Sequence, residues 1–211
     1  MNEVFIIGGG NSVKDVDKSK LENKDLIVIN KAIVDFPNPK YFITMDQSVL
    51  KKLDKGARYL RNTTATKVFI ANFVPSYMEE KNGQIVDTRW NLVYKLNIFD
   101  MIIKSKNLEK LGTTFKDFGH GNNSAFCALQ LAILLGYEKI NLIGVDLVAE
   151  GTTHYHGGYG VSLEKFREKL DEYYQTFKTA ILEFKSNNEN IEIYSRSPIS
   201  RLNHVLLYKE L

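Results

Sequence analysis

Short apolar runs recur along the chain, and a glycine, a proline or polar residues follow each of them. Runs of this kind, rich in branched and aromatic side chains, are typical of strands that are buried on both faces. The pattern predicts strands at residues 4–7, 26–29, 41–45, 68–71, 140–145 and 191–194.

Two longer segments have the spacing of helices. Residues 125–135 are almost entirely apolar, with Asn123 or Ser124 as the N-cap and Gly136 as the C-terminal stop. Residues 163–184 carry apolar side chains at steps of three and four, after Ser162 as a cap. Strands that alternate with helices predict a single α/β domain over residues 1–211, with a Rossmann-like, mostly parallel sheet and helices on both faces.

The middle of the chain, residues 74–116, lacks this alternation. It contains Trp90, a turn at Asn82 and Gly83, and mixed charges. Long excursions inside a compact domain are more often functional than not. We therefore predict a lid or insertion over the ends of the strands.

Composition places few limits on function. The chain of 211 residues is 44% hydrophobic and 25% charged, which is ordinary for a globular protein, and its net charge of +3 is only weak evidence for nucleic-acid binding. The single cysteine, Cys127, falls inside the apolar helix and is expected in the core. No apolar run approaches the roughly 20 residues that cross a bilayer, and no secretory signal is evident. We expect a cytoplasmic protein without a membrane span.

The first glycine loop follows the first predicted strand. In doubly wound folds this is where the strand turns into a helix whose start faces phosphate. Val13 replaces the third glycine of the dinucleotide fingerprint, and Asn30 stands where a nicotinamide-cofactor enzyme prefers an acidic residue. A tight turn without a ligand is the plain alternative. We predict that the loop and the second strand end contact a nucleotide other than NAD through Gly8, Gly9, Gly10, Asn11, Ser12 and Asn30.

The second glycine loop precedes the apolar helix, whose free N–H groups and positive dipole end suit a phosphate. The predicted ligand-binding residues here are His120, Gly121, Asn122, Asn123 and Ser124. Asp46 and Asp146 end two strands at the edge where ligands bind in open α/β sheets. Each could instead cap a neighbouring helix.

Further candidates lie towards the C-terminus. His154 and His156 follow the strand that ends in Asp146, and they suit acid–base or phosphate chemistry. Zinc is not expected, because no third ligand accompanies them. Arg196 and Ser197 follow the last strand and are predicted to contact phosphate, although exposed, solvated side chains are the alternative.

The order and spacing of these segments resemble glycosyltransferase family 42, the bacterial sialyltransferases, and the related motility accessory proteins and hydroxymethylpterin diphosphokinases. The resemblance covers both ends of the chain but not the middle. The residues that carry it are 8–17, Asn30, Asn123, Ser124, 135–147, 193–194 and 197–198. It implies a GT-A-type sheet with a lid that binds a nucleotide-sugar, with donor contacts at Gly8, Gly10, Ser12, Asn30 and Ser124.

The chain departs from this family at chemical positions. Gly9 stands where the family has asparagine, and Val148 and His154 stand at its paired tyrosines. The family's catalytic histidine, near the start of the long helix, has no counterpart here. The donor sugar and the catalytic base therefore stay open.

The function predicted from the sequence is a glycosyltransferase that uses a nucleotide-sugar and acts through His154, His156 and Asp146. It requires no cofactor, although magnesium remains open, and no metal site is assigned. The acceptor is expected to be a surface glycan or, less favoured, a hydroxylated DNA base. One alternative is a diphosphokinase that uses ATP and magnesium, with Asp46 and Asp146 as ligands; the other is a non-catalytic nucleotide-binding module. A homo-oligomer is compatible with the sequence.

Overall fold

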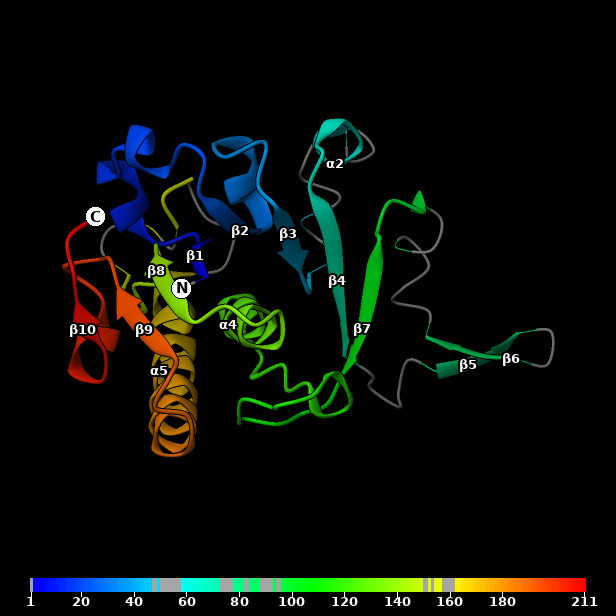
Figure 1. Cartoon of the computed structure of the whole chain (residues 1–211). Coiled ribbons are helices and arrows are strands. Elements are labelled where there is room, and N and C mark those ends of the chain that lie inside the picture. Colours follow the sequence, from blue (N-terminus) through cyan, green and yellow to red (C-terminus); the bar gives the residue numbers. More distant parts are fainter. Residues whose placement is uncertain are drawn as a thin grey trace.

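The computed structural model describes residues 2–46, 49, 58–72, 78–81, 84–87, 93, 96–149, 152, 154–156 and 162–211. Within these residues, eight parallel strands form one sheet in the order β10-β9-β8-β1-β2-β3-β4-β7 (Figure 1). The strands of this sheet are β1 (Glu3–Ile7), β2 (Asp25–Ile29), β3 (Tyr41–Thr44), β4 (Thr66–Asn72), β7 (Met101–Ser105), β8 (Lys139–Ile143), β9 (Glu192–Ser195) and β10 (Leu207–Tyr208).

The strand order reverses at β1. The chain adds β2, β3, β4 and β7 on one side of β1, then returns through α4 (Ser124–Leu134) and places β8 on the other side. β8 pairs with β1 from Glu3 opposite Lys139 to Ile7 opposite Ile143. The carboxyl ends of β1 and β8 therefore lie next to each other, at the switch point where open parallel sheets bind ligands.

Helices cover both faces of the sheet. Successive residues of a strand point to opposite faces, so Val4 and Ile6 join the core beneath α4 and α5 (Leu163–Asn187), whereas Phe5 and Ile7 join the core on the other face. Short elements cover that second face: η1 (Asn11–Asp15), η2 (Lys18–Leu21), η3 (Asn30–Val34) and α2 (Arg58–Asn62). The remaining short elements are η6 (Phe115–Asp117) and η7 (Arg201–His204).

The predicted α/β fold is confirmed, and the predicted strands and helices lie within a few residues of the observed ones. The N-cap of α4 is Asn123, whose Oδ1 accepts hydrogen bonds from the N–H groups of Ala125 and Phe126. Gly136 has the left-handed φ of +79° expected of a helix stop. Ser162 caps α5 by accepting from the Lys165 N–H.

The segment after the first glycine loop differs from the expectation. Instead of an α-helix, the chain forms η1 and η2, two short 3₁₀ turns. The Asp17 side chain accepts hydrogen bonds from the backbone and hydroxyl of Ser19 and starts the second turn. Serine, aspartate and asparagine bond to nearby backbone in this way and compete with helical bonding.

The middle segment contains two features that the sequence pattern did not reveal. β7 is an edge strand of the main sheet, and β5 (Met78–Lys81) pairs antiparallel with β6 (Gln84–Asp87) in a separate hairpin. In Figure 1 this hairpin stands beyond β7, away from α4 and α5. Asn82, Gly83 and Trp90 lie outside the described residues. A lid function for this segment stays a prediction.

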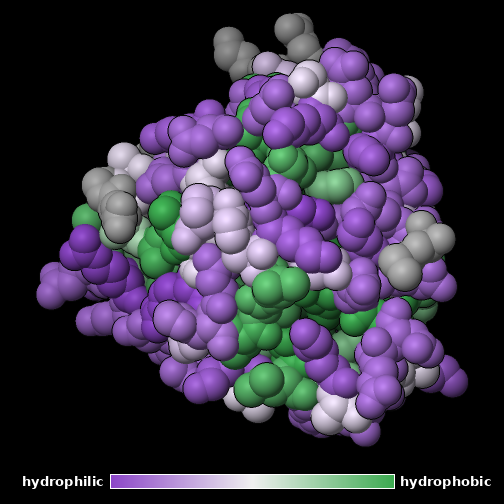
Figure 2. Space-filling view, turned by 60° about the vertical axis from the view of Figure 1, so that its left-hand side comes forward, coloured by the Kyte–Doolittle hydropathy of each residue, from purple (hydrophilic) through white to green (hydrophobic). Residues whose placement is uncertain are grey.

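The face shown in Figure 2 is mostly hydrophilic, with hydrophobic residues gathered in a few places. Among the helices of the described residues, none has the length and apolar character that crossing a membrane requires.

Candidate functional site

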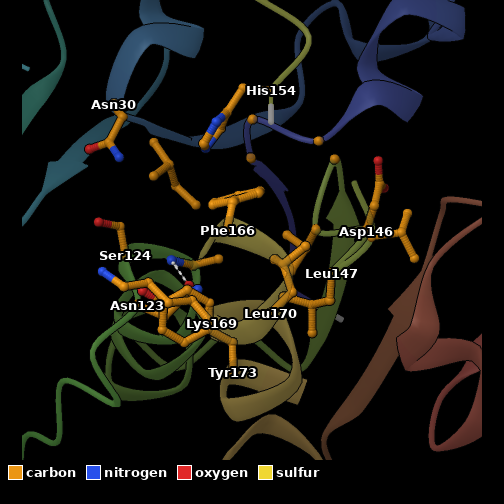
Figure 3. Close-up of a pocket in the computed structure, with 18 of the residues that line it drawn as sticks. Asn30, Asn123, Ser124, Asp146, Leu147, His154, Phe166, Lys169, Leu170 and Tyr173 are labelled. Atoms are coloured by element: carbon orange, nitrogen blue, oxygen red, sulfur yellow. Dashed lines mark hydrogen bonds between the residues drawn. The ribbon is translucent and has the colours of Figure 1, made fainter. Parts of the chain in front are cut away.

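A cavity of about 410 Å³ lies at the carboxyl ends of the strands around the switch point, and α5 forms one of its walls (Figure 3). Its lining combines two glycine-rich loops, the ends of β2, β3 and β8, two histidines and one face of α5. The lining residues are Gly8, Gly9, Gly10, Ile29, Asn30, Met45, Asp46, Asn122, Asn123, Ser124, Ala125, Gly144, Val145, Asp146, Leu147, Val148, His154, His156, Phe166, Lys169, Leu170 and Tyr173.

The first glycine loop continues the pairing of β1 with β8. The Gly8 N–H donates to the Ile143 carbonyl at 2.8 Å, and the Gly10 N–H donates to the Gly144 carbonyl at 2.7 Å. A Cβ at Gly8 would collide with the Gly144 carbonyl, and a Cβ at Gly10 would collide with the Asp146 carboxylate. The glycines at these two positions therefore allow the two loops to pack together, and two of the N–H groups predicted to face phosphate are already bonded.

The Asp146 side chain accepts hydrogen bonds from within the protein. Its buried carboxylate accepts the Ser12 N–H at 2.9 Å and the Ser12 hydroxyl at 2.6 Å. These bonds cap η1 and join the ends of β1 and β8. The geometry therefore favours the capping alternative for Asp146 and a structural role for Ser12, which does not line the cavity.

The second glycine loop divides into a structural part and a part that faces the cavity. His120 is buried away from the cavity, and its Nδ1 accepts the Asn122 N–H at 3.0 Å. Burial lowers the pKa of His120. Gly121, with φ of +48°, allows close approach of the Phe126 ring. Asn122, Asn123 and Ser124 line the cavity, and the Ser124 hydroxyl forms no hydrogen bond with the described residues.

The histidine loop lies against the first glycine loop. The rings of His154 and His156 stack with centroids 5.2 Å apart, and the His154 ring is 5.0 Å from that of Phe166 on α5. A Cβ on Gly9 would lie 2.8 Å from His154 Cδ2, so the glycine makes room for this imidazole. The loop is held by the Tyr155 N–H, which donates to the Gly9 carbonyl, and by the Tyr155 hydroxyl, which donates to Asp35 at 2.8 Å.

Both imidazoles are uncharged at neutral pH. Burial, reinforced by His156 and by the Lys31 ammonium, lowers the pKa of His154 to about 4. Burial and Lys31 also lower the pKa of His156. Each ring can therefore accept a proton, but near pH 7 neither is a cationic proton donor.

Two strand-end residues complete the side of the cavity formed by β2 and β3. Asn30 follows β2 with a left-handed φ of +54°, and its buried Oδ1 has no hydrogen-bond partner among the described residues. A buried amide oxygen without a partner is an acceptor open to a ligand. Asp46 follows β3 and also lines the cavity.

Arg196 and Ser197 do not line the cavity. The Arg196 guanidinium donates to Asn141 Oδ1 at 2.8 Å and to the carbonyls of Lys209 and Glu210, which fastens the C-terminal segment to β9. Ser197 is buried beside Ser195 and Asn203. The geometry gives no support to their predicted phosphate contact. Asn11, which accepts from Thr152, also lies outside the lining.

The sequence pattern placed Phe166, Leu170 and Tyr173 on the apolar face of α5 but assigned them no role, and Lys169 was missed. All four line the cavity. Tyr173 was the available sign that this helix face lines a cavity. Its ring can pack among apolar side chains, while its hydroxyl needs a polar environment. Within the described residues, no three histidine, cysteine, aspartate or glutamate side chains form a group suited to a metal ion.

The fold is similar to that of solved sialyltransferase structures. CstII from Campylobacter jejuni with the substrate analogue CMP-3FNeuAc is 20% identical, with 99% of this chain and 86% of that chain covered and a TM-score of 0.53. A variant of CST-II with CMP is 21% identical, with 99% and 86% covered and a TM-score of 0.52. CST-II with a trisaccharide acceptor and CMP is 19% identical, with 98% and 85% covered and a TM-score of 0.50.

These similarities confirm, at the level of the fold, the resemblance seen in the sequence. No protein-family model matches this sequence, and no curated protein matches it either.

Proposed function

We propose that this protein is a glycosyltransferase that moves a sugar from a nucleotide-sugar donor to an acceptor hydroxyl. The observation that carries the proposal is the cavity at the β1–β8 switch point, where two glycine-rich loops and a pair of uncharged imidazoles meet. The similar folds crystallised with CMP-3FNeuAc and with CMP support it, because they show that a fold of this shape holds such a nucleotide.

The proposed donor is a pyrimidine sugar-nucleotide. Asn30 offers an amide to a base or a ribose hydroxyl, in the place where nicotinamide-binding enzymes prefer a carboxylate. Ser124 offers a phosphate oxygen a hydroxyl that no described residue engages in a hydrogen bond. The glycine loop in this assignment shapes the site more than it binds phosphate, because Gly8, Gly10 and Ser12 use their N–H groups within the protein.

The proposed base is His154, with His156 stacked behind it. An attacking hydroxyl must lose its proton, and an uncharged imidazole in the cavity wall can accept it. A pKa of about 4 makes His154 a weak base in the empty protein. A bound anionic donor would raise the pKa, because opposite charge favours the protonated form. We assign Asp146 to holding Ser12 rather than to proton transfer.

The acceptor we propose is a glycan hydroxyl, in line with the trisaccharide acceptor in one of the similar structures. Nothing in the described residues favours a DNA base, and nothing favours a homo-oligomer. The diphosphokinase alternative gains no support either, since Asp146 is bound to Ser12 and no group of three metal-ligating side chains is present among the described residues.

A thermal-shift screen of the full chain tests the proposal. CMP, UDP and their sugar conjugates should raise the melting temperature, whereas NAD should not, because a ligand that binds only the folded state stabilises it. GDP and ATP, each with and without magnesium, complete the panel. A shift with ATP and magnesium alone would replace the glycosyltransferase by the diphosphokinase. Binding without sugar release or transfer from any conjugate would leave a nucleotide-binding module.

A further inference from the structure

We infer that Lys169 and Tyr173, on the cavity side of α5, form the subsite for the donor phosphate and stabilise the charge that develops on it as it leaves. This inference rests on the proposed function and adds a pair of charge-stabilising residues. Figure 3 shows both residues on α5, and the cavity that they line is also lined by Asn123 and Ser124 at the start of α4.

The pair is placed by the register of α5. Residues three and four apart share one face of a helix, so Phe166, Lys169, Leu170 and Tyr173 all face the cavity. Farther along the same helix, Phe177, Ile181 and Phe184 pack in the core against the sheet. The core contacts of the later turns therefore hold the first turns in place as a cavity wall.

The charges of the lining single out Lys169. It is the only cationic side chain among the described lining residues, which also include the carboxylates Asp46 and Asp146. Within the described part of the chain, the Lys169 ammonium forms no ion pair or hydrogen bond. An ammonium that lines a cavity without an internal carboxylate partner is available to an anionic ligand.

Tyr173 supplies an uncharged donor beside the cation. Its hydroxyl forms no hydrogen bond with the described residues. Burial and the nearby Glu172 raise the pKa of Tyr173, so the O–H stays protonated near neutral pH. A lysine and a tyrosine four residues apart can both donate to one phosphate group.

The other candidate donors are largely occupied. Gly8, Gly10 and Ser12 direct their N–H groups at carbonyls and at Asp146. The Asn123 side chain caps the N–H groups of Ala125 and Phe126 at the start of α4. The two imidazoles are uncharged. Among the described lining residues, Lys169 on α5 is therefore the cation that can meet a leaving phosphate, and the Ser124 hydroxyl stays available as an uncharged donor.

In the transfer step, the side chains of the cavity take up both the proton and the negative charge that the reaction releases. The bond between the anomeric carbon and the phosphate oxygen breaks, and its electron pair stays on that oxygen. The acceptor oxygen forms the new bond to the anomeric carbon, and its proton passes to the uncharged His154 or His156. The nucleotide gains one negative charge, which Lys169 and Tyr173 stabilise through hydrogen bonds.

Calorimetric titration of the full chain with CMP or UDP, and with cytidine or uridine, tests the subsite. Lys169→Met should weaken binding of the nucleotide about 10- to 100-fold, as expected for loss of a hydrogen bond to a charged group. The affinity for the nucleoside, which has no phosphate, should stay unchanged. It should also reduce the salt dependence of nucleotide binding. Tyr173→Phe should act in the same direction, and Lys169→Arg should restore most of the affinity.

The matched control is Lys185→Met, the same substitution on the same helix about 24 Å farther along its axis. It should bind the nucleotide as the wild type does. Equal nucleotide affinity in Lys169→Met and wild type would overturn the subsite and leave the proposed function standing. A wild-type chain that binds no nucleotide would overturn both. An equal loss of nucleoside and nucleotide affinity would show that Lys169 shapes the cavity and does not bind phosphate.

Discussion

Asn123 and Ser124 are adjacent polar residues at the start of α4, and they have different roles. Asn123 caps the helix with two hydrogen bonds, of 2.7 and 3.2 Å, to Ala125 and Phe126. Ser124 faces the cavity, and its hydroxyl is unused by the described residues. Stability and ligand binding are therefore separable by substitution at neighbouring positions.

We expect Ser124→Ala to weaken nucleotide binding by about 1.5–3 kcal/mol, the usual contribution of a hydrogen bond to a charged group, with an unchanged melting temperature. Asn123→Ala is the control and should lower the free energy of unfolding by about 1 kcal/mol through loss of the cap. Calorimetric titration and urea unfolding of both variants measure these effects. A loss of stability in Ser124→Ala with normal affinity would mean that Ser124 supports the helix and does not contact phosphate.

The contact between Ser12 and Asp146 offers a structural explanation for a carboxylate that resembles a catalytic base. A carboxylate at the end of a central strand is a reasonable candidate base, yet both oxygens of Asp146 accept hydrogen bonds from Ser12. Gly10 has no side chain to obstruct this contact. The result is a fixed junction between the ends of β1 and β8, whose Gly10 and Asp146 line the cavity.

At the scale of elements, the histidine loop depends on η3 for its position. η3 ends next to Asp35, which accepts the Tyr155 hydroxyl, and Tyr155 lies between the two histidines. The His154 ring in turn packs at a tilt against the Phe166 ring of α5. The loop thus connects the short helices on one face of the sheet to the long helix on the other, with the imidazoles between them.

We expect Tyr155→Phe to lower turnover at saturating donor by less than His154→Ala, which should lower it by about 10²–10⁴-fold as typical for loss of an acid–base group. The reason is that Tyr155 positions the imidazoles but does not react. Tyr137→Phe is a matched control, because the Tyr137 hydroxyl donates to Asp25 at 2.7 Å and neither residue lines the cavity. It should lower stability and leave turnover unchanged.

Steady-state kinetics with the donor selected by the screen give both turnover values. Full activity in Tyr155→Phe would show that the contact with Asp35 does not hold the histidine loop in its working position. Full activity in His154→Ala, with activity lost in His156→Ala, would transfer the role of base to His156.

At the scale of the whole molecule, the half-buried His154 couples folding to pH. The pKa of His154 is about 4 in the folded protein, below the ordinary value of 6.5. As pH falls below about 6.5, the unfolded chain therefore takes up this proton first, and the folded state loses stability until pH approaches about 4. Placing an uncharged imidazole beside Lys31 and His156 thus costs stability only in acid.

We expect His154→Gln to lose less free energy of unfolding than the wild type between about pH 7 and pH 5, because it removes a group that protonates on unfolding. His204→Gln, at an exposed histidine in η7, should keep the pH dependence of the wild type. Urea unfolding at the two pH values measures the difference. Identical pH dependence in wild type and His154→Gln would show that the imidazole titrates in the folded chain as it does in the unfolded chain.

The sequence alone determined the elements whose signals are local. Apolar runs predicted six strands of the main sheet, with ends within a few residues of the observed ones. Helical spacing and capping chemistry likewise predicted α4 with its Gly136 stop and α5 with its Ser162 cap. The glycines after the first strand and the polar loop before α4 pointed to the switch point, where the structure has a cavity. Local patterns suffice here because buried parallel strands and amphipathic helices need particular side chains at each position.

Tertiary structure alone decided which side chains face the cavity. β7 was missed because its apolar run is only three residues long: the polar residues Lys104 and Ser105 follow Met101, Ile102 and Ile103. Asp146 accepts a hydrogen bond from Ser12, and Arg196 donates one to Asn141. Both bonds join residues that are far apart in the chain, so local spacing in the sequence does not reveal them. Lys169 and Tyr173 face the cavity because α5 crosses the strand ends, and that crossing depends on packing against the sheet.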